Sequence, residues 1–317
     1  MGIETSYIRT AKITNIEHMG GVVGAPQYSI AAGGGVLSNR IYSGVPFVAG
    51  KLGTSEFDAL YWFKSQNGAP FPRDIRRNMM INAGLFSDGS DCVKEWCQYM
   101  MENIHLLDEI ALWNPIKPVE ERYFLQQYAP QIKKYLPLRS LEPFYQDLPE
   151  NRWSLAIETP FCVVSPFVET IEGQWKKRDV LFPMLLWSPK ATFCGGVCVG
   201  YSPLICEAEE ICSWPTHILQ KGWRAGVDFV VDSCVATGAK FAFVGAGALS
   251  LPICFELKKR GISAIHTGGG TQIIFGIRGR RWLSHSVISH FFNENWVSPQ
   301  ESEIPSAGSV IEGGCYF

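Results

Sequence analysis

A single glutamate follows a strand-like apolar run near residue 50. The segment GKLGTSE, residues 50–56, lies between the apolar runs VPFVA and FDALYWF. This order predicts a buried strand, a turn at Gly53 and a helix whose first turn carries Glu56. In open α/β sheets, ligands bind at the carboxyl ends of the strands. Glu56 is therefore a candidate functional carboxylate, although it could also only cap its own helix.

A second turn of this kind lies in KFAFVGAGALSLPICFELKKRG, residues 240–261. An apolar strand ends at Val244, Gly245 and Gly247 form the turn, and a helix follows. Glycines at such a turn let a phosphate group approach the backbone, and the helix N-terminus adds partial positive charge. A tight strand-to-helix turn without a ligand would use the same glycines, so both interpretations stay open.

The next strand, ISAIH, ends in a histidine followed by a glycine cluster. His266 and Thr267 come first, and Gly268 and Gly269 follow. The position of these residues at a strand's carboxyl end makes them candidate ligand-binding residues. His266 could equally be a histidine that is hydrogen-bonded to backbone at the edge of the sheet.

Three arginines follow in the segment FGIRGRRW. Arg278, Arg280 and Arg281 lie close in sequence to two glycine turns, and guanidinium groups form paired, charge-assisted hydrogen bonds to phosphate oxygens. A solvated charged face is the alternative. Together with the glycine turns, the arginines favour a nucleoside diphosphate ligand, and a sugar nucleotide fits best.

A nicotinamide cofactor is disfavoured by two positions. Ser250 stands where the dinucleotide fingerprint has its third glycine or alanine, and no carboxylate follows the next strand to hold a ribose hydroxyl. A methyltransferase loses support for the same reason. A further strand-like run, FCVVSPF, ends at Ser165, which is a candidate nucleotide contact or an ordinary turn residue.

These segments belong to a regular alternation of apolar strands with helical stretches of 10 to 15 residues. That alternation predicts an α/β fold with a mostly parallel sheet and helices on both faces, in Rossmann-like halves. We expect an N-terminal arm or edge hairpin over 1–44, one domain over 45–290 with halves near 45–150 and 151–290, and a C-terminal tail over 291–317. Other predicted elements are a helix over 91–112, a surface loop over 136–153, a strand at VLFPMLLW and a long helix over 216–238.

The composition limits the possible partners. The chain has 317 residues, 46% of them hydrophobic, and a net charge of -2, so no basic surface for nucleic acid is expected. The longest uncharged stretch is too short to cross a membrane, and no secretory signal opens the chain. We therefore expect a cytoplasmic protein whose ten cysteines are reduced. The start MGIETS weakly fits a myristoylation motif.

Several segments resemble glycosyltransferases encoded in capsular-polysaccharide gene clusters, with relatives in large algal viruses, and at a distance the GT-D fold group. The segment from Phe241 to Trp282 carries most of the resemblance, and VVSPFVETIEGQWKKR, NAGLF and GKLGTSE match other blocks. The match covers about residues 45–285. It implies transfer of a sugar from a nucleotide diphosphate donor, such as a UDP-sugar, to a hydroxyl of a glycan or glycoprotein in polysaccharide biosynthesis.

One departure from this family concerns the metal. GT-D enzymes hold a divalent ion with a D-x-E motif, and the matching residues here are Thr54, Ser55 and Glu56, so the aspartate is missing. One carboxylate makes a weak Mg²⁺ or Mn²⁺ site, so we expect no metal cofactor. Positive charge would then come from the arginines and helix N-termini.

Without a metal, Glu56 is free to act as general base in an inverting transfer. His266 is a second candidate catalytic residue. Other candidate bases are the aspartates Asp74, Asp88, Asp91 and Asp232. Two alternatives to a glycosyltransferase are a dinucleotide-dependent oxidoreductase and a non-catalytic protein that binds a nucleotide or glycan.

Overall fold

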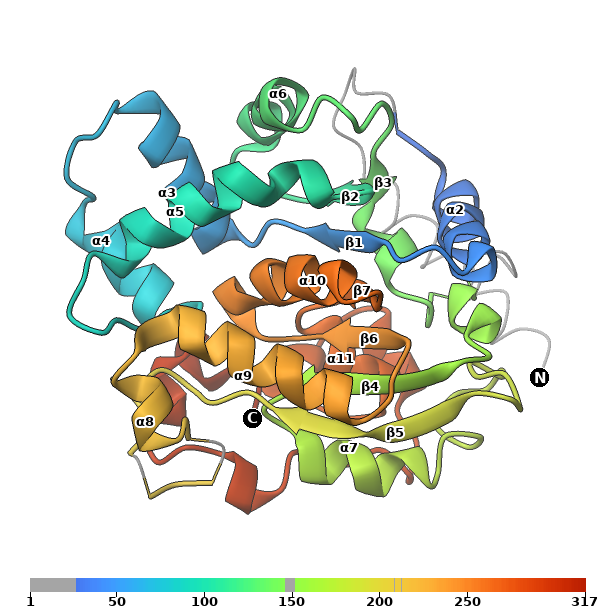
Figure 1. Cartoon of the computed structure of the whole chain (residues 1–317). Coiled ribbons are helices and arrows are strands. Elements are labelled where there is room, and N and C mark those ends of the chain that lie inside the picture. The colour runs from blue at the N-terminus through green and yellow to red at the C-terminus, as the bar shows by residue number, and fades with distance from the viewer. Residues whose placement is uncertain (1–26, 146–151, 208, 212) are drawn as a thin grey trace.

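A computed structural model describes residues 27–145, 152–207, 209–211 and 213–317 (Figure 1). Seven strands of these residues form one sheet in the order β3-β2-β1-β7-β6-β4-β5, and every pairing is parallel. Helices pack on the sheet, so the predicted α/β fold with a parallel sheet is confirmed. None of the described helices has the length and apolar content that a membrane span requires.

The strands are β1 (Val48–Lys51), β2 (Glu109–Leu112), β3 (Leu136–Pro137), β4 (Pro160–Ser165), β5 (Thr192–Cys198), β6 (Phe241–Val244) and β7 (Ser263–His266). The helices are α2 (Ile30–Ser43), α3 (Thr54–Ser65), α4 (Arg73–Arg77), α5 (Cys92–Asn103), α6 (Pro118–Tyr128), α7 (Val168–Trp175), α8 (Thr216–Leu219), α9 (Gly222–Ala236), α10 (Ser250–Lys259) and α11 (Gly270–Ile274), and a π-helix over Asn78–Asn82 continues α4.

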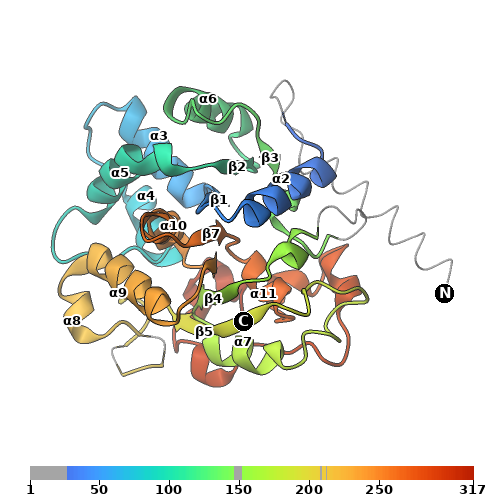
Figure 2. The ribbon, with the colours of Figure 1, turned by 45° about the vertical axis from the view of Figure 1, so that its right-hand side comes forward.

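Both faces of the sheet are buried, because neighbouring strand residues pack into different layers. In β6, Ala242 and Val244 belong to the apolar cluster that contains buried residues of α3, α5, α6, α9 and α10. Phe241 and Phe243 belong to the cluster that contains residues of α2, α7 and α11. Figure 2 shows these two helical layers from the side. Continuous apolar runs are what a parallel sheet with two covered faces requires.

The two predicted halves share one continuous sheet. Strands β1 to β3 come from the first half and β4 to β7 from the second. Strand β1 pairs with β7, where Val48 lies opposite Ala264 and Ala49 opposite Ile265. The carboxyl ends of β1, β7, β6 and β4 therefore lie next to one another along one edge of the sheet.

The N-terminal segment differs from the predicted hairpin. Residues 30–43 form α2, and Ser29 caps this helix by accepting a hydrogen bond from the N–H of Ala32 at 3.2 Å. The glycines in this segment suggested a hairpin, but Leu37 is fully buried against the sheet, and such packing outweighs weak helix propensity. The remainder of the predicted arm and the MGIETS motif lie outside the described residues.

Four internal predictions are also corrected. The helix predicted over 91–112 ends at Asn103, and its last residues form β2, because pairing with β1 and β3 outweighs the local helical pattern. The loop predicted over 136–153 contains β3 and a buried 3-10 turn, Leu138–Leu141; residues 146–151 are outside the described part. VLFPMLLW forms turns, although Trp187 is buried. The long helix over 216–238 is divided into α8 and α9.

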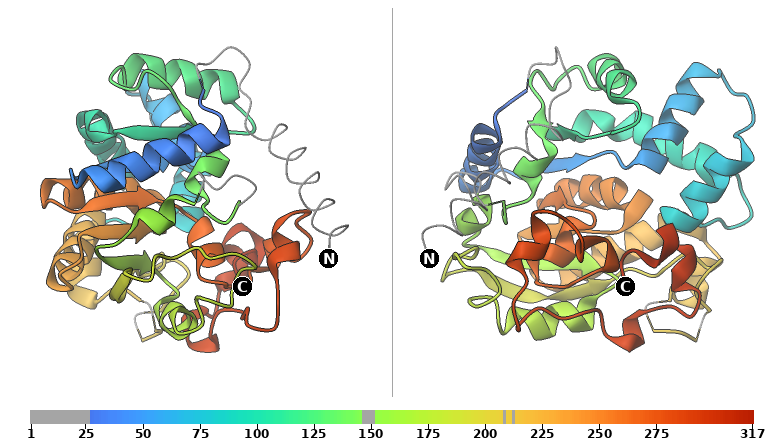
Figure 3. Two further views of the ribbon diagram at one scale, coloured as in Figure 1. Left: turned by 90° about the vertical axis from the view of Figure 1, so that its right-hand side faces the viewer. Right: turned by 180° about the vertical axis from the view of Figure 1, so that it is seen from behind.

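The segment predicted as a C-terminal tail packs against the domain (Figure 3). Glu303 is fully buried, and its carboxylate accepts hydrogen bonds from the N–H groups at the start of α7, including that of Glu169 at 2.7 Å. Tyr201 donates its hydroxyl hydrogen to the carbonyl of Glu303 at 2.9 Å. These contacts bring the last residues, 311–317, to the edge of the sheet where the strands end.

Candidate functional site

A pocket of about 410 Å³ opens at the carboxyl edge of the sheet. Its walls come from the segments after β1, β2, β4, β5, β6 and β7, from the end of the π-helix and from residues 311–317. Parallel strands direct their carboxyl ends to the same edge, so turns far apart in sequence meet in one cavity.

Most of the candidate residues lie in this pocket. The candidates that line it are Gly53, Glu56, Ser165, Gly245, Gly247, His266, Gly268, Gly269 and Arg281. Other candidates do not line it. Thr267 is buried and shares a hydrogen bond of 2.7 Å with the hydroxyl of Thr271. Arg278 lies outside the lining, and its backbone N–H donates to the carbonyl of Val297.

Lys51, the last residue of β1, is a pocket residue that the sequence interpretation missed. Its ammonium group lies 4.3 Å from the ring centroid of Trp113, which also lines the pocket. Burial lowers the pKa of Lys51, and Arg281 adds to this effect, whereas Glu56 opposes it. A lysine that ends a strand carries no local signal of function, so only the assembled pocket identifies it.

Glu56 lies in the first turn of α3 and folds back over the turn before it. A Cβ atom added at Gly53 would overlap the carboxyl group of Glu56. Burial raises the pKa of Glu56, and its own backbone N–H and Lys51 oppose that rise. Glu56 is thus a partly buried carboxyl group that lines the pocket, and its proton affinity is increased, as suits a general base.

His266 ends β7 and is held by the neighbouring strand. Its Nδ1 lies 3.2 Å from the carbonyl oxygen of Val244, so Nδ1 carries the hydrogen and donates it. Burial, helped by the charge of Lys51, lowers the pKa of His266 to about 3. The imidazole is therefore neutral near neutral pH, and Nε2 can accept a hydrogen bond. Such a group is a weak base but a well-oriented acceptor.

Glycine occupies positions 247 and 269 for different physical reasons. Gly247 has φ +52, and a Cβ there would overlap the carbonyl oxygen of Ala83, which accepts the N–H of Ala248 at 2.8 Å. Packing within the protein therefore requires glycine at 247. Gly269 has φ -62, and a Cβ there would lie 3.5 Å from Tyr316 in ordinary contact. The protein itself does not require glycine at 269, which leaves ligand approach as a reason for it.

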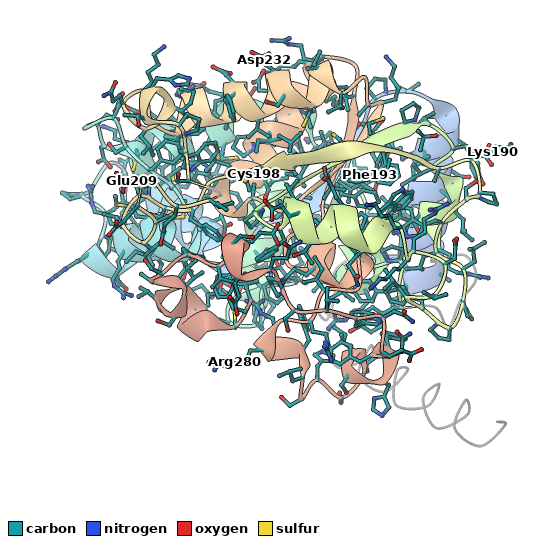
Figure 4. The ribbon with its side chains drawn as sticks, turned by 90° about the horizontal axis from the view of Figure 1, so that it is seen from below. Lys190, Phe193, Cys198, Glu209, Asp232 and Arg280 are labelled. Carbon is teal, nitrogen blue, oxygen red and sulfur yellow. The ribbon has the colours of Figure 1, made fainter. Side chains whose placement is uncertain are left out.

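The arginines of the 278–281 segment are not equivalent. Arg281 reaches the pocket, where it pairs with Glu312, donates from Nε to Sγ of Cys315 at 3.1 Å and lies 4.1 Å from the ring centroid of Tyr316. Arg280 is exposed at the periphery (Figure 4). The residues around 312–317 were predicted only as a tail, because nothing local in their sequence indicates a pocket wall.

Aromatic side chains line the pocket beside the charged groups. Trp113, Phe167, Tyr201, Trp214, Tyr316 and Phe317 all contribute. The ring of Phe317 lies 6.1 Å from that of Phe167 and 6.3 Å from that of Tyr201. Rings of this kind can stack on a nucleobase or a sugar. Ser165, at the end of β4, accepts the N–H of Phe167 at 3.1 Å, so it has a turn role in addition to its position in the pocket.

The alternative carboxylates lie elsewhere. Asp91 caps α5 and pairs with Arg76, and Asp232 lies on the outer side of α9 (Figure 4). Neither Asp74 nor Asp88 lines the pocket. Within the described ranges, no three His, Cys, Asp or Glu side chains gather closely enough to hold a metal ion.

Comparisons of the chain with protein-family models, with curated proteins and with solved structures found no match.

Proposed function

We propose that this chain is a glycosyltransferase that takes a sugar from a nucleotide diphosphate donor, such as a UDP-sugar, and transfers it to a hydroxyl of a glycan or glycoprotein. The observation that carries this proposal is the meeting of three glycine turns, after β1, β6 and β7, in one pocket with two cations and the carboxyl group of Glu56. Backbone at glycine turns, together with lysine and arginine, is a common environment for phosphate groups.

The charged and aromatic walls suit different parts of such a donor. The diphosphate needs hydrogen-bond donors and positive charge, which Lys51 and Arg281 supply. A nucleobase or sugar ring needs flat apolar surface, which the aromatic residues supply. A pocket of about 410 Å³ lies within the range of small-molecule sites.

In the proposed reaction, the carboxylate of Glu56 accepts the proton of the acceptor hydroxyl. The hydroxyl oxygen forms the new bond to the anomeric carbon as the bond from that carbon to the diphosphate oxygen breaks. The nucleoside diphosphate leaves with the electron pair of that bond, and nearby cations stabilise its charge. A single base on the acceptor side gives inversion at the anomeric carbon. The neutral His266 accepts a hydrogen bond from the substrate through Nε2.

A test of this proposal measures donor binding and turnover together. UDP, GDP, CMP and their sugars are screened by thermal shift in EDTA and in Mn²⁺, and donor hydrolysis or transfer is then followed for any ligand that binds. At 100 times the dissociation constant, a ligand stabilises the folded state by about 2.7 kcal/mol. Stabilisation in EDTA with Glu56-dependent turnover supports the proposal. Binding without turnover, unchanged in Glu56→Gln, would indicate a non-catalytic binding protein.

A further inference from the structure

We propose that Lys51 and the turn at Gly268–Gly269 form the subsite for the pyrophosphate part of the ligand, with Lys51 as its main charge partner. This inference rests on the proposed function for the nucleoside and sugar parts of the ligand. It assigns the phosphate-binding role to a residue outside the arginine segment 278–281.

Lys51 lies directly against this turn. A Cβ built at Gly268 would be 3.3 Å from Cε and 3.7 Å from Nζ of Lys51. Gly268 has φ +54, a conformation that glycine adopts without strain. The absence of a side chain at this position also leaves room for Lys51 to pack against the turn. Both residues line the same pocket. An anion in contact with the ammonium group would therefore also lie beside the backbone of the turn.

The ammonium group lacks a protein counter-ion. Among the described residues, no carboxylate lies within ion-pair distance of Nζ, and its closest recorded partner is the face of Trp113. Glu56 is near enough to influence the pKa of Lys51 without pairing. A partly buried charge without a partner is costly, so an anionic ligand would relieve a penalty that the free protein carries.

Backbone donors are also present in the lining of the same pocket. The N–H of Gly269 and the N–H groups of Thr54 and Ser55 have no recorded acceptor in the described part of the chain. Thr54 and Ser55 open α3, a helix of 12 residues, and line the pocket beside Lys51. A pyrophosphate has enough oxygens to accept from several of these donors at once.

The arginines are less suitable for this role. Arg281 is already paired with Glu312 and stacked on Tyr316, so a ligand would have to compete with protein contacts for it. Arg278 does not line the pocket, and Arg280 is exposed. Lys51 is the pocket cation whose charge is available without breaking an ion pair.

The test uses inorganic pyrophosphate, titrated calorimetrically in EDTA into the full chain. Lys51→Met should bind at least about tenfold more weakly than the unmodified protein, because one charge-assisted contact is lost. Lys51→Arg should recover part of the affinity. Arg278→Met should bind normally. Lys64→Met is the matched control, since Lys64 also lies over an aromatic ring, 4.7 Å from the centroid of Tyr128, but is exposed on the surface.

Equal affinity in Lys51→Met, or no pyrophosphate binding to the unmodified protein, would overturn the proposal. If a nucleotide sugar binds and reacts while Lys51→Met keeps full affinity for it, the subsite is wrong and the proposed function stands. If pyrophosphate binding depends on Lys51 but no nucleotide sugar binds, the subsite stands and the proposed function fails.

A second measurement applies if Lys51→Met does not fold. Pyridoxal phosphate and pyridoxal are each added to the unmodified protein and fixed to lysine with borohydride, and the labelled peptide is identified. The subsite predicts that pyridoxal phosphate labels Lys51 more than pyridoxal does, and that pyrophosphate protects it. Equal labelling by the two aldehydes, or no protection, would overturn the assignment.

Discussion

The glycine at position 269 allows a ligand role to be separated from a packing role. Gly269 has φ -62 and ψ -18, which alanine adopts freely, and the added Cβ would lie 3.5 Å from Tyr316 and 3.7 Å from Arg281. We therefore expect Gly269→Ala to leave the free protein unchanged or to stabilise it by about 0.4–1 kcal/mol, since the unfolded chain loses freedom.

The added methyl group would lie against the pocket residues Tyr316 and Arg281, so in the proposal it narrows the space beside the turn that the phosphate contacts. Loss of one or more hydrogen bonds to a charged group costs about 1.5–3 kcal/mol, which corresponds to roughly 10- to 150-fold weaker binding. Gly247→Ala is the contrasting variant. It combines an unfavourable left-handed conformation with overlap on the carbonyl of Ala83, so it should destabilise the fold by roughly 2–5 kcal/mol.

Urea unfolding and calorimetric titration with the bound nucleotide or pyrophosphate would measure both effects. We expect Gly269→Ala to fold normally and to bind the ligand weakly. We expect Gly247→Ala to have a lower free energy of unfolding. Wild-type affinity in Gly269→Ala would refute the reasoning that the turn after β7 holds the ligand.

Three glutamates give further predictions. Glu56→Gln should lower kcat by about 10²- to 10⁴-fold with donor affinity little changed. The wild-type rate should rise with pH through the raised pKa of Glu56. Equal kcat values for the variant and the wild type in steady-state assays would exclude Glu56 as the base. Burial raises the pKa of Glu121 to about 7, so this carboxyl group binds a proton more tightly in the folded state than in the unfolded state. The free energy of unfolding should therefore fall by about 3 kcal/mol from pH 4.5 to 7. Urea unfolding at both ends of that range should show a smaller fall in Glu121→Gln. Glu303→Ala should lower the free energy of unfolding by about 2 kcal/mol, because buried N–H groups at the start of α7, including that of Thr170, lose their acceptor. Glu301 is an exposed neighbour, so Glu301→Ala should change the free energy of unfolding by less than about 0.5 kcal/mol in the same assay.

The sheet and its orientation were predictable because the signals are local. The runs that end at Ser165, Val244 and His266 are continuous apolar segments with turn residues after them, and each forms a strand of the parallel sheet. Once the sheet is parallel, its carboxyl ends must share an edge. The convergence of Glu56, Gly269 and the other turn residues in one pocket follows from that geometry.

The missed features depend on contacts that local sequence does not encode. Strand β2 follows α5 within a stretch of helical periodicity, and only pairing with β1 and β3 reveals it. Lys51 gains significance because Trp113 and Gly268 come from two other segments. The segment 311–317 forms part of the pocket wall together with Arg281. The burial of Glu303 fixes the chain that leads to this segment.

The most direct test of the account is a calorimetric titration of nucleoside diphosphates and their sugars into the full chain in EDTA. The account predicts that at least one diphosphate binds without a metal and that binding weakens at least about tenfold in Lys51→Met and in Gly269→Ala. It would be contradicted if no nucleoside diphosphate bound at millimolar concentration. Binding that both variants leave unchanged would also contradict it, because the ligand would then not occupy the turn after β7.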